Sequence, residues 1–292
     1  MKTTKWVIVI LLALITSSFL FFYHGKVARE SIIFFPIDDS VTFDKASTTL
    51  QFAGKKDDDE YIIEWDVTSL TNKEIYLRQD ISLLFSDGKL VDTLSEWEDQ
   101  SQKLAQYKKI TGEDSSHYQT ISLHYGEIHL ENDLIRSTQR MSRDHLYVID
   151  SEFTDLFSFK RPLTDEELEW KDILDKVTEQ HLEYSWNQLI DYYKIDETKY
   201  EKIPFIELER YNTDPLLGLS KAKTQEVIGS LWEGLYKNYF LGLKTKEGKV
   251  IEPIGSTMPL ILIAKNYSHI VILIQAENGL PFKFIQNISL ND

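Results

Sequence analysis

Histidines are the side chains best suited to hold a transition metal or to move a proton near neutral pH, and four of the seven fall in one stretch of this chain. They are His117, His124, His129 and His145. On a continuous strand, residues an odd number of positions apart point to opposite faces, which separates His117 from His124 and His124 from His129. A hairpin at Gly126 would reunite one pair, but no carboxylate pattern completes a ligand set. We therefore predict no metal and no other cofactor.

Carboxylates are abundant, but their pattern indicates no particular chemistry. The run Lys55–Glu60 holds three aspartates and a glutamate, yet it lacks the glycine and the final glutamate of a calcium-binding EF-hand loop. It is predicted to be a solvated turn between two strands. Among 47 acidic residues some pair always lies close together, so a glycosidase-type carboxylate pair is neither indicated nor ruled out.

Nucleophilic catalysis has no signature either. The chain has no cysteine and hence no thiol nucleophile. The only related motif, Gly255-Ser256-Thr257, does not continue into the Gly-x-Ser-x-Gly turn of serine hydrolases. We predict no catalytic residues.

The densest group of aromatic side chains lies in the segment 231–241, where a helix is predicted. A stripe with helical spacing is expected to face the core, and it consists of Ile228, Leu231, Leu235 and Tyr239. Trp232 and Tyr236 lie beside that stripe. We predict that their rings are exposed and form a binding surface for a partner, because exposed aromatic rings often anchor interfaces.

The elements that must position these groups change in kind along the chain. From residue 48 to 150, short segments alternate apolar and polar residues, with Trp65 as a candidate core tryptophan and Ser86-Asp87-Gly88-Lys89 as a hairpin turn. Seven or more such strands predict a mostly antiparallel, β-sandwich-like lobe. A lobe of that length is expected to fold on its own.

After Pro162 the pattern becomes helical. Thr164 and Glu167 form a capping box, and a helix follows with Trp170 in its core-facing stripe. The same stripe contains Ile173, Leu174, Val177 and His181, so His181 is predicted to be a core histidine. A second helix over 223–241 and three strands near the end predict helices packed on a small antiparallel sheet, with 269–274 as its central strand. The fold class is therefore α+β.

Residues 6–23 form an uncharged apolar run preceded by Lys2 and Lys5. As a helix it would span roughly 27 Å, close to the roughly 30 Å hydrocarbon core of a bilayer. Basic residues on the short side keep the N-terminus in the cytoplasm. We predict a single transmembrane anchor with the large domain outside; the alternative is a cleaved signal peptide with a weak site at Thr16-Ser17-Ser18.

The charge of the chain restricts its partners. Four of the 32 basic residues lie in the first 29 positions, which leaves 28 basic against 47 acidic residues and a net charge of −19 for the rest. Such a surface repels phosphate backbones, so nucleic-acid binding is disfavoured. The absence of cysteine means that this exported domain has no disulfides and is stabilised by core burial, as in many bacterial surface proteins.

The predicted organisation has five parts: a cytoplasmic tip at 1–5, the anchor at 6–23, a linker at 24–47, a β-rich lobe at 48–160 and an α+β lobe at 161–292. The expected function is that of a membrane-anchored binding or scaffold protein of the cell envelope, without a catalytic role, whose partner is another envelope or membrane protein. Two alternatives stay open. One is an anchored hydrolase of wall polymer or peptide with a carboxylate pair between the lobes; the other is an accessory regulator of another membrane protein.

Overall fold

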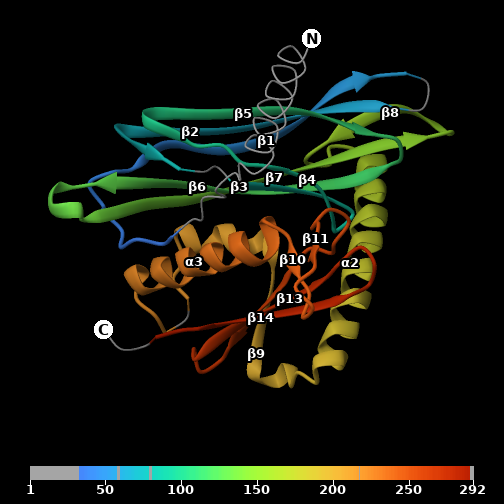
Figure 1. Ribbon diagram of the computed structural model, residues 1–292. Coiled ribbons are helices and arrows are strands. Elements are labelled where there is room, and N and C mark those ends of the chain that lie inside the picture. Colours follow the sequence, from blue (N-terminus) through green and yellow to red (C-terminus); the bar gives the residue numbers. More distant parts are fainter. Residues whose placement is uncertain (1–32, 58–59, 79–80, 217, 290–292) are drawn as a thin grey trace, which may run out of the picture. The chain divides into compact units, whose positions relative to one another are not determined.

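The computed structural model describes residues 33–57, 60–78, 81–216 and 218–289, which belong to one compact unit (Figure 1). Antiparallel sheets form most of its regular structure and a few helices the remainder, which confirms the predicted combination of antiparallel sheets with helices. The predicted tip at 1–5 and anchor at 6–23 lie outside the described residues. Within those residues, no helix has both the length and the apolar character to cross a bilayer.

The first half of the described chain forms one antiparallel sheet of eight strands. The strands are β1 (Phe43–Lys55), β2 (Tyr61–Leu77), β3 (Ile81–Ser86), β4 (Lys89–Leu94), β5 (Glu98–Gly112), β6 (Ser116–His129), β7 (Ile135–Ser151) and β8 (Thr154–Phe159). The pairing branches at β2, which lies between β1 and β5 but joins β6 only at Tyr76 and Leu77. The sheet therefore folds over itself into two layers, with β1, β2 and β5 in one and β3, β4, β6 and β7 in the other (Figure 1).

Apolar side chains from both layers meet between them. Strand β2 alternates between buried and half-buried positions as the sequence predicts, and Trp65 is fully buried with its Nε1 donating to Thr48 Oγ1 at 3.2 Å. The rest of this cluster consists of Leu50, Tyr61, Ile63, Val67, Leu84, Tyr118, Leu146 and Val148. Strands β3 and β6 are buried on both faces, because a second core lies on their other side.

The second half of the chain forms helices and a four-stranded sheet with the order β14-β13-β12-β9. Its helical elements are α2 (Asp165–Tyr193), η2 (Glu197–Lys199), η3 (Phe205–Asn212), α3 (Lys221–Leu235) and η4 (Tyr236–Phe240), the last being a π-helical turn. Its strands are β9 (Tyr200–Pro204), β10 (Leu243–Lys244), β11 (Val250–Ile251), β12 (Leu260–Ala264), β13 (His269–Gln275) and β14 (Pro281–Asn287). The prediction that 269–274 is a central strand is confirmed, since β13 pairs with β12 and β14.

Helix α2 begins as the sequence predicts, with both hydrogen bonds of the capping box at Thr164 and Glu167 present. The predicted core-facing stripe is right only at Leu174. Ile173 and Val177 are 44% and 37% exposed, His181 is also exposed, and Trp170 is only half-buried. The buried face consists of Leu174 together with Thr178, Leu182, Ser185, Leu189 and Ile190. Helix α2 runs from the first sheet to the second (Figure 1), so the positions of both sheets, rather than its own apolar residues, decide which face it buries.

The largest core cluster joins the two halves of the chain. Its members from the first sheet are Ile81, Leu83, Phe85, Leu90, Ile121, Leu123, Tyr125 and Met141. They pack against α3, η3 and the inner face of the second sheet, and Figure 1 shows α3 between the two sheets.

This position of α3 buries the two rings predicted to be exposed. Trp232 and Tyr236 are only 1% and 5% exposed, and the Trp232 indole nitrogen lies 3.2 Å from Met141 Sδ. The expectation of exposed rings is therefore wrong. The physical reason is that α3 is covered from two sides, so its apolar surface is wider than the single stripe that one covered face requires.

A short segment before β1, which we call the tether (residues 33–38), is fixed to α3 and β7. The Phe34 N–H donates to Glu233 Oε2 at 3.0 Å, and the Asp38 N–H donates to the Ser137 carbonyl at 2.8 Å. The Ser137 N–H in turn donates to the Pro36 carbonyl at 2.9 Å. The Phe34 ring lies directly over Gly229 of α3, where a Cβ atom would come within 2.0 Å of it.

Two glycines of α3 provide a matched test of this packing. Gly229→Ala must displace Phe34 and is expected to destabilise the fold by about 1–3 kcal/mol, as overpacking does. Gly234→Ala meets no atom within 4 Å and should stabilise the helix by about 0.5–1 kcal/mol. Urea unfolding followed by circular dichroism measures both changes. Shifts of the same sign in the two variants would contradict the close contact between the tether and α3.

Candidate functional site

A cleft of about 850 Å³ lies between one face of α2, one face of the β6–β7 pair and the start of η3. The α2 side chains that line it are three or four residues apart and so share one helix face. They are Lys171, Asp175, Thr178, Glu179, Leu182, Glu183 and Trp186.

The opposite wall comes from the pairing of β6 with β7. His117 lies opposite Tyr147 and Gln119 opposite His145, so alternate residues of both strands face α2. Further along the same face the residues become apolar and pack against the helices and the second sheet; they are Ile121, Leu123, Tyr125 and Met141. The cleft therefore lies at the polar end of this face of the β6–β7 pair, and the apolar end of the same face is part of the protein core.

Asp175 is the centre of a hydrogen-bonded group on the floor of the cleft. Its Oδ1 accepts from the Tyr147 hydroxyl at 2.7 Å and lies 3.1 Å from His117 Nδ1, while its Oδ2 accepts from Lys171 Nζ. Burial alone would raise the pKa of Asp175, but its contacts with His117, Lys171 and Tyr147 outweigh burial and hold that pKa below its ordinary value. Burial and the bond to Asp175 raise the pKa of Tyr147. Asp175 is therefore a carboxylate that orients its neighbours.

Two buried side chains on this floor each have a polar atom without a hydrogen bond. His117 is 6% exposed and Thr178 is 5% exposed, and neither His117 Nε2 nor Thr178 Oγ1 has a hydrogen-bond partner among the described residues. The His117 ring is held in place by stacking on Tyr147, with 4.1 Å between the ring centroids. Buried polar atoms almost always have a partner. Two such atoms in one cleft mark a place for a ligand or an ordered solvent molecule.

The histidines predicted to lie apart do so. Strand β6 is unbroken through Gly126, so His117 and His124 lie on opposite faces, and the hairpin closes at 130–134 instead. His124 is fully buried between the layers, with its ring nitrogens 2.8 and 2.7 Å from the hydroxyls of Ser69 and Ser142. That arrangement makes it a structural residue.

Sequence reasoning missed the pair that does come together, His117 and His145, whose ring centroids are 6.0 Å apart. Burial lowers the pKa of His145, whose Nε2 lies 2.8 Å from the Lys160 carbonyl. The position of the turn between β6 and β7 would have predicted this pair from the sequence. Once the turn is placed at Asn132, His117 falls opposite residue 147 and next to His145 across the strands.

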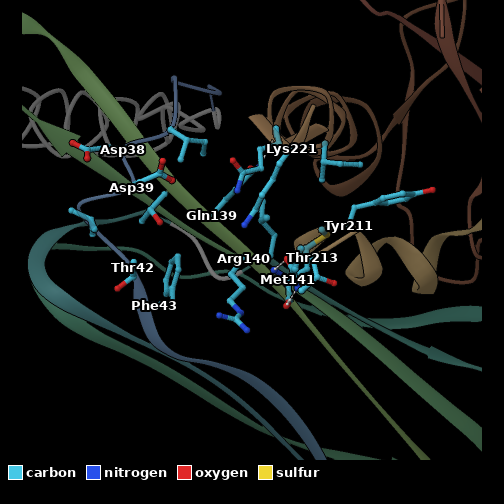
Figure 2. Close-up of a pocket in the computed structure, with 17 residues that line it drawn as sticks. Asp38, Asp39, Thr42, Phe43, Gln139, Arg140, Met141, Tyr211, Thr213 and Lys221 are labelled. Atoms are coloured by element: carbon cyan, nitrogen blue, oxygen red, sulfur yellow. Dashed lines mark hydrogen bonds between the residues drawn. The ribbon is translucent and has the colours of Figure 1, made fainter. Parts of the chain in front are cut away.

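A second cavity of about 300 Å³ lies between the tether, β7 and α3 (Figure 2). Its charged side chains carry both signs: the half-buried Asp38 and the exposed Asp39 on one side, the exposed Lys221 and Arg140 on the others. Within it, Asn212 donates to the Met141 carbonyl at 2.8 Å and accepts from the Met141 N–H at 2.9 Å, which ties η3 to β7. Because its charges balance and much of its polar lining is already bonded, this cavity is the weaker candidate.

The α2 carboxylates of the cleft do not have the features of a glycosidase general acid. A general acid of the glycosidase type is a carboxyl group kept protonated by burial, whereas Glu179 and Glu183 are exposed and Asp175 is held as an anion. In the part of the chain that the structure describes, no group of three or more histidine or carboxylate side chains is arranged to hold a metal ion. The predicted absence of a metal itself stays a prediction.

The sequence matches no known family model, and comparisons with curated proteins and with solved structures found no match either. The geometry of the cleft is therefore the basis for the function proposed below.

Proposed function

We propose that this chain is a membrane-anchored binding protein of the cell envelope, without a catalytic role, and that it holds its partner in the cleft beside α2. The observation that carries the proposal is the pair of unpartnered buried atoms, His117 Nε2 and Thr178 Oγ1, at the floor of an open cleft. A structural role alone would leave such atoms bonded to other protein groups. The place of the protein in the envelope rests on the apolar run at 6–23 and the lysines before it.

Binding is favoured over hydrolysis because the carboxylates of the cleft are placed to contact a ligand and not to act as the general acid or base of a hydrolase. Its central carboxylate, Asp175, is engaged by three neighbours, Asp144 is paired with Lys160, and Glu179 and Glu183 are open to solvent. An accessory regulator of another membrane protein would also bind that protein through the cleft. The regulator alternative is therefore a special case of the proposed binding function. The partner we favour is a protein of the same membrane or envelope.

The test is site-specific photo-crosslinking of the full-length protein in intact cells. A photoreactive residue at Gln119, which lines the cleft, should give one discrete adduct. The control position is Tyr107 on β5, which is 52% exposed on the layer away from α2 and should give none. Equal labelling from both positions, or no adduct from Gln119, would overturn the cleft as the binding site.

A further inference from the structure

We infer that the cleft recognises a cationic side chain of the lysine or arginine type on its partner, an inference that rests on the binding function proposed above. Its first basis is a row of carboxylates on α2. Asp175, Glu179 and Glu183 follow one another at intervals of four residues and line the same cleft. Like charges at this spacing repel one another and destabilise a helix.

The protein does not neutralise this row itself. Within the described residues, Glu179 and Glu183 have neither an ion pair nor a hydrogen-bond partner, unlike Asp175, which is paired with Lys171. The other basic residue of the cleft, Arg143, lies 3.7 Å from Glu209. Two further acidic residues of the lining are also paired, Asp144 with Lys160 and Glu207 with Arg210, so that Glu179 and Glu183 are its unpaired carboxylates. A site of this charge attracts cations and repels anions.

The floor of the cleft accepts hydrogen bonds. His117 Nδ1 lies 3.1 Å from Asp175 Oδ1, and this contact favours the tautomer with the ring proton on Nδ1, in which the Nε2 lone pair is an acceptor. The Thr178 hydroxyl is a second acceptor on the same floor. Ammonium and guanidinium groups carry only donors, so they complement these two atoms.

An apolar wall beside the carboxylates suits the alkyl stem of such a side chain. It consists of Leu182, Trp186, Ile206 and Met258. The Trp186 indole is fixed by the hydrogen bond from its Nε1 to the Met258 carbonyl at 2.9 Å, so its ring is already oriented before a ligand arrives. Lysine and arginine bury their stems along apolar surface and also bind over aromatic rings. This combination of stem and charge distinguishes them from small inorganic cations.

The test uses the purified full-length protein in detergent, labelled with 5-fluorotryptophan, and follows the ¹⁹F resonance of Trp186, which the variant Trp186→Phe identifies. The probes are acetyl-Gly-X-Gly-X-Gly-amide peptides in which X is lysine, arginine, norleucine or glutamate. The lysine and arginine peptides should shift the Trp186 resonance saturably. Norleucine, which keeps a stem without the charge, and glutamate should not.

Matched variants of α2 then locate the interaction. The double variant Glu179→Gln/Glu183→Gln should weaken binding of the cationic peptides at least tenfold. The control Glu166→Gln/Glu169→Gln removes the same charge from the same helix outside the cleft and should change the affinity less than twofold. Because all four glutamates are exposed, both double variants should fold.

Failure of this inference is distinguishable from failure of the proposed function. If no peptide shifts Trp186, if norleucine or glutamate binds as well as lysine, or if both double variants behave alike, the cationic ligand is wrong. A crosslinked adduct at Gln119 that persists in the Glu179→Gln/Glu183→Gln variant would show that the cleft binds its partner through other chemistry.

Discussion

Replacing Trp232 with alanine is expected to destabilise the fold by about 3–5 kcal/mol, the usual result of truncating a fully buried tryptophan. The ring is 1% exposed and packs against Phe205, with 5.2 Å between the ring centroids. Typical domains are stable by only about 5–15 kcal/mol, so the variant should be largely unfolded at a temperature where the parent is not. Thermal unfolding followed by circular dichroism measures the change.

Trp97→Ala is the control for this experiment, because it removes the same side chain from a surface position. Trp97 is 48% exposed and its ring contacts Tyr76, so its loss should cost no more than about 1.5 kcal/mol. A Trp232 variant as stable as the Trp97 variant would show that α3 does not pack as described. That outcome would also restore the exposed binding ring predicted from the sequence.

A fragment of residues 40–160 is expected not to fold stably when separated from the rest of the chain. Eight apolar side chains of β3, β4, β6 and β7, from Ile81 to Met141, belong to the core cluster that the second half completes. Fully burying a large apolar side chain contributes about 1.5–3 kcal/mol, so exposing all eight would cost as much as the stability of a typical domain or more. The fragment should bind a hydrophobic dye and show poor dispersion of its amide NMR signals.

The matched control is the fragment of residues 33–289, which keeps the second half and should give well-dispersed signals. Good dispersion from residues 40–160 alone would instead restore the expectation, based on length, that the β-rich lobe folds on its own. It would also mean that the core between the layers, around Trp65, is sufficient without the shared cluster.

Features determined by neighbouring residues were predictable from the sequence. The capping box at Thr164, the hairpin at Ser86–Lys89 and the alternation around Trp65 depend on local spacing, and all three are present. Strand β9 was missed, because it is short, has a charged sequence and ends at Pro204, a residue that a strand at the edge of a sheet tolerates.

Features determined by distant contacts were not predictable in this way. The buried face of α2 and the burial of Trp232 depend on where two sheets lie relative to the helices, and hydrophobic spacing within a helix does not contain that information. The cleft is a further case. His117 and Asp175 are far apart in the sequence and meet only because α2 crosses the end of the β6–β7 pair.

The tether determines how the fold responds to mechanical force. A pull on the chain at Ile33 is borne first by the bonds of Phe34 and Asp38 to α3 and β7, before it reaches β1. Those bonds connect to the centre of the molecule, where α3 and the first sheet share their core. Load arriving from the N-terminal side is therefore spread into the interior, and the pairing of β1 with β2 is spared until the tether is released.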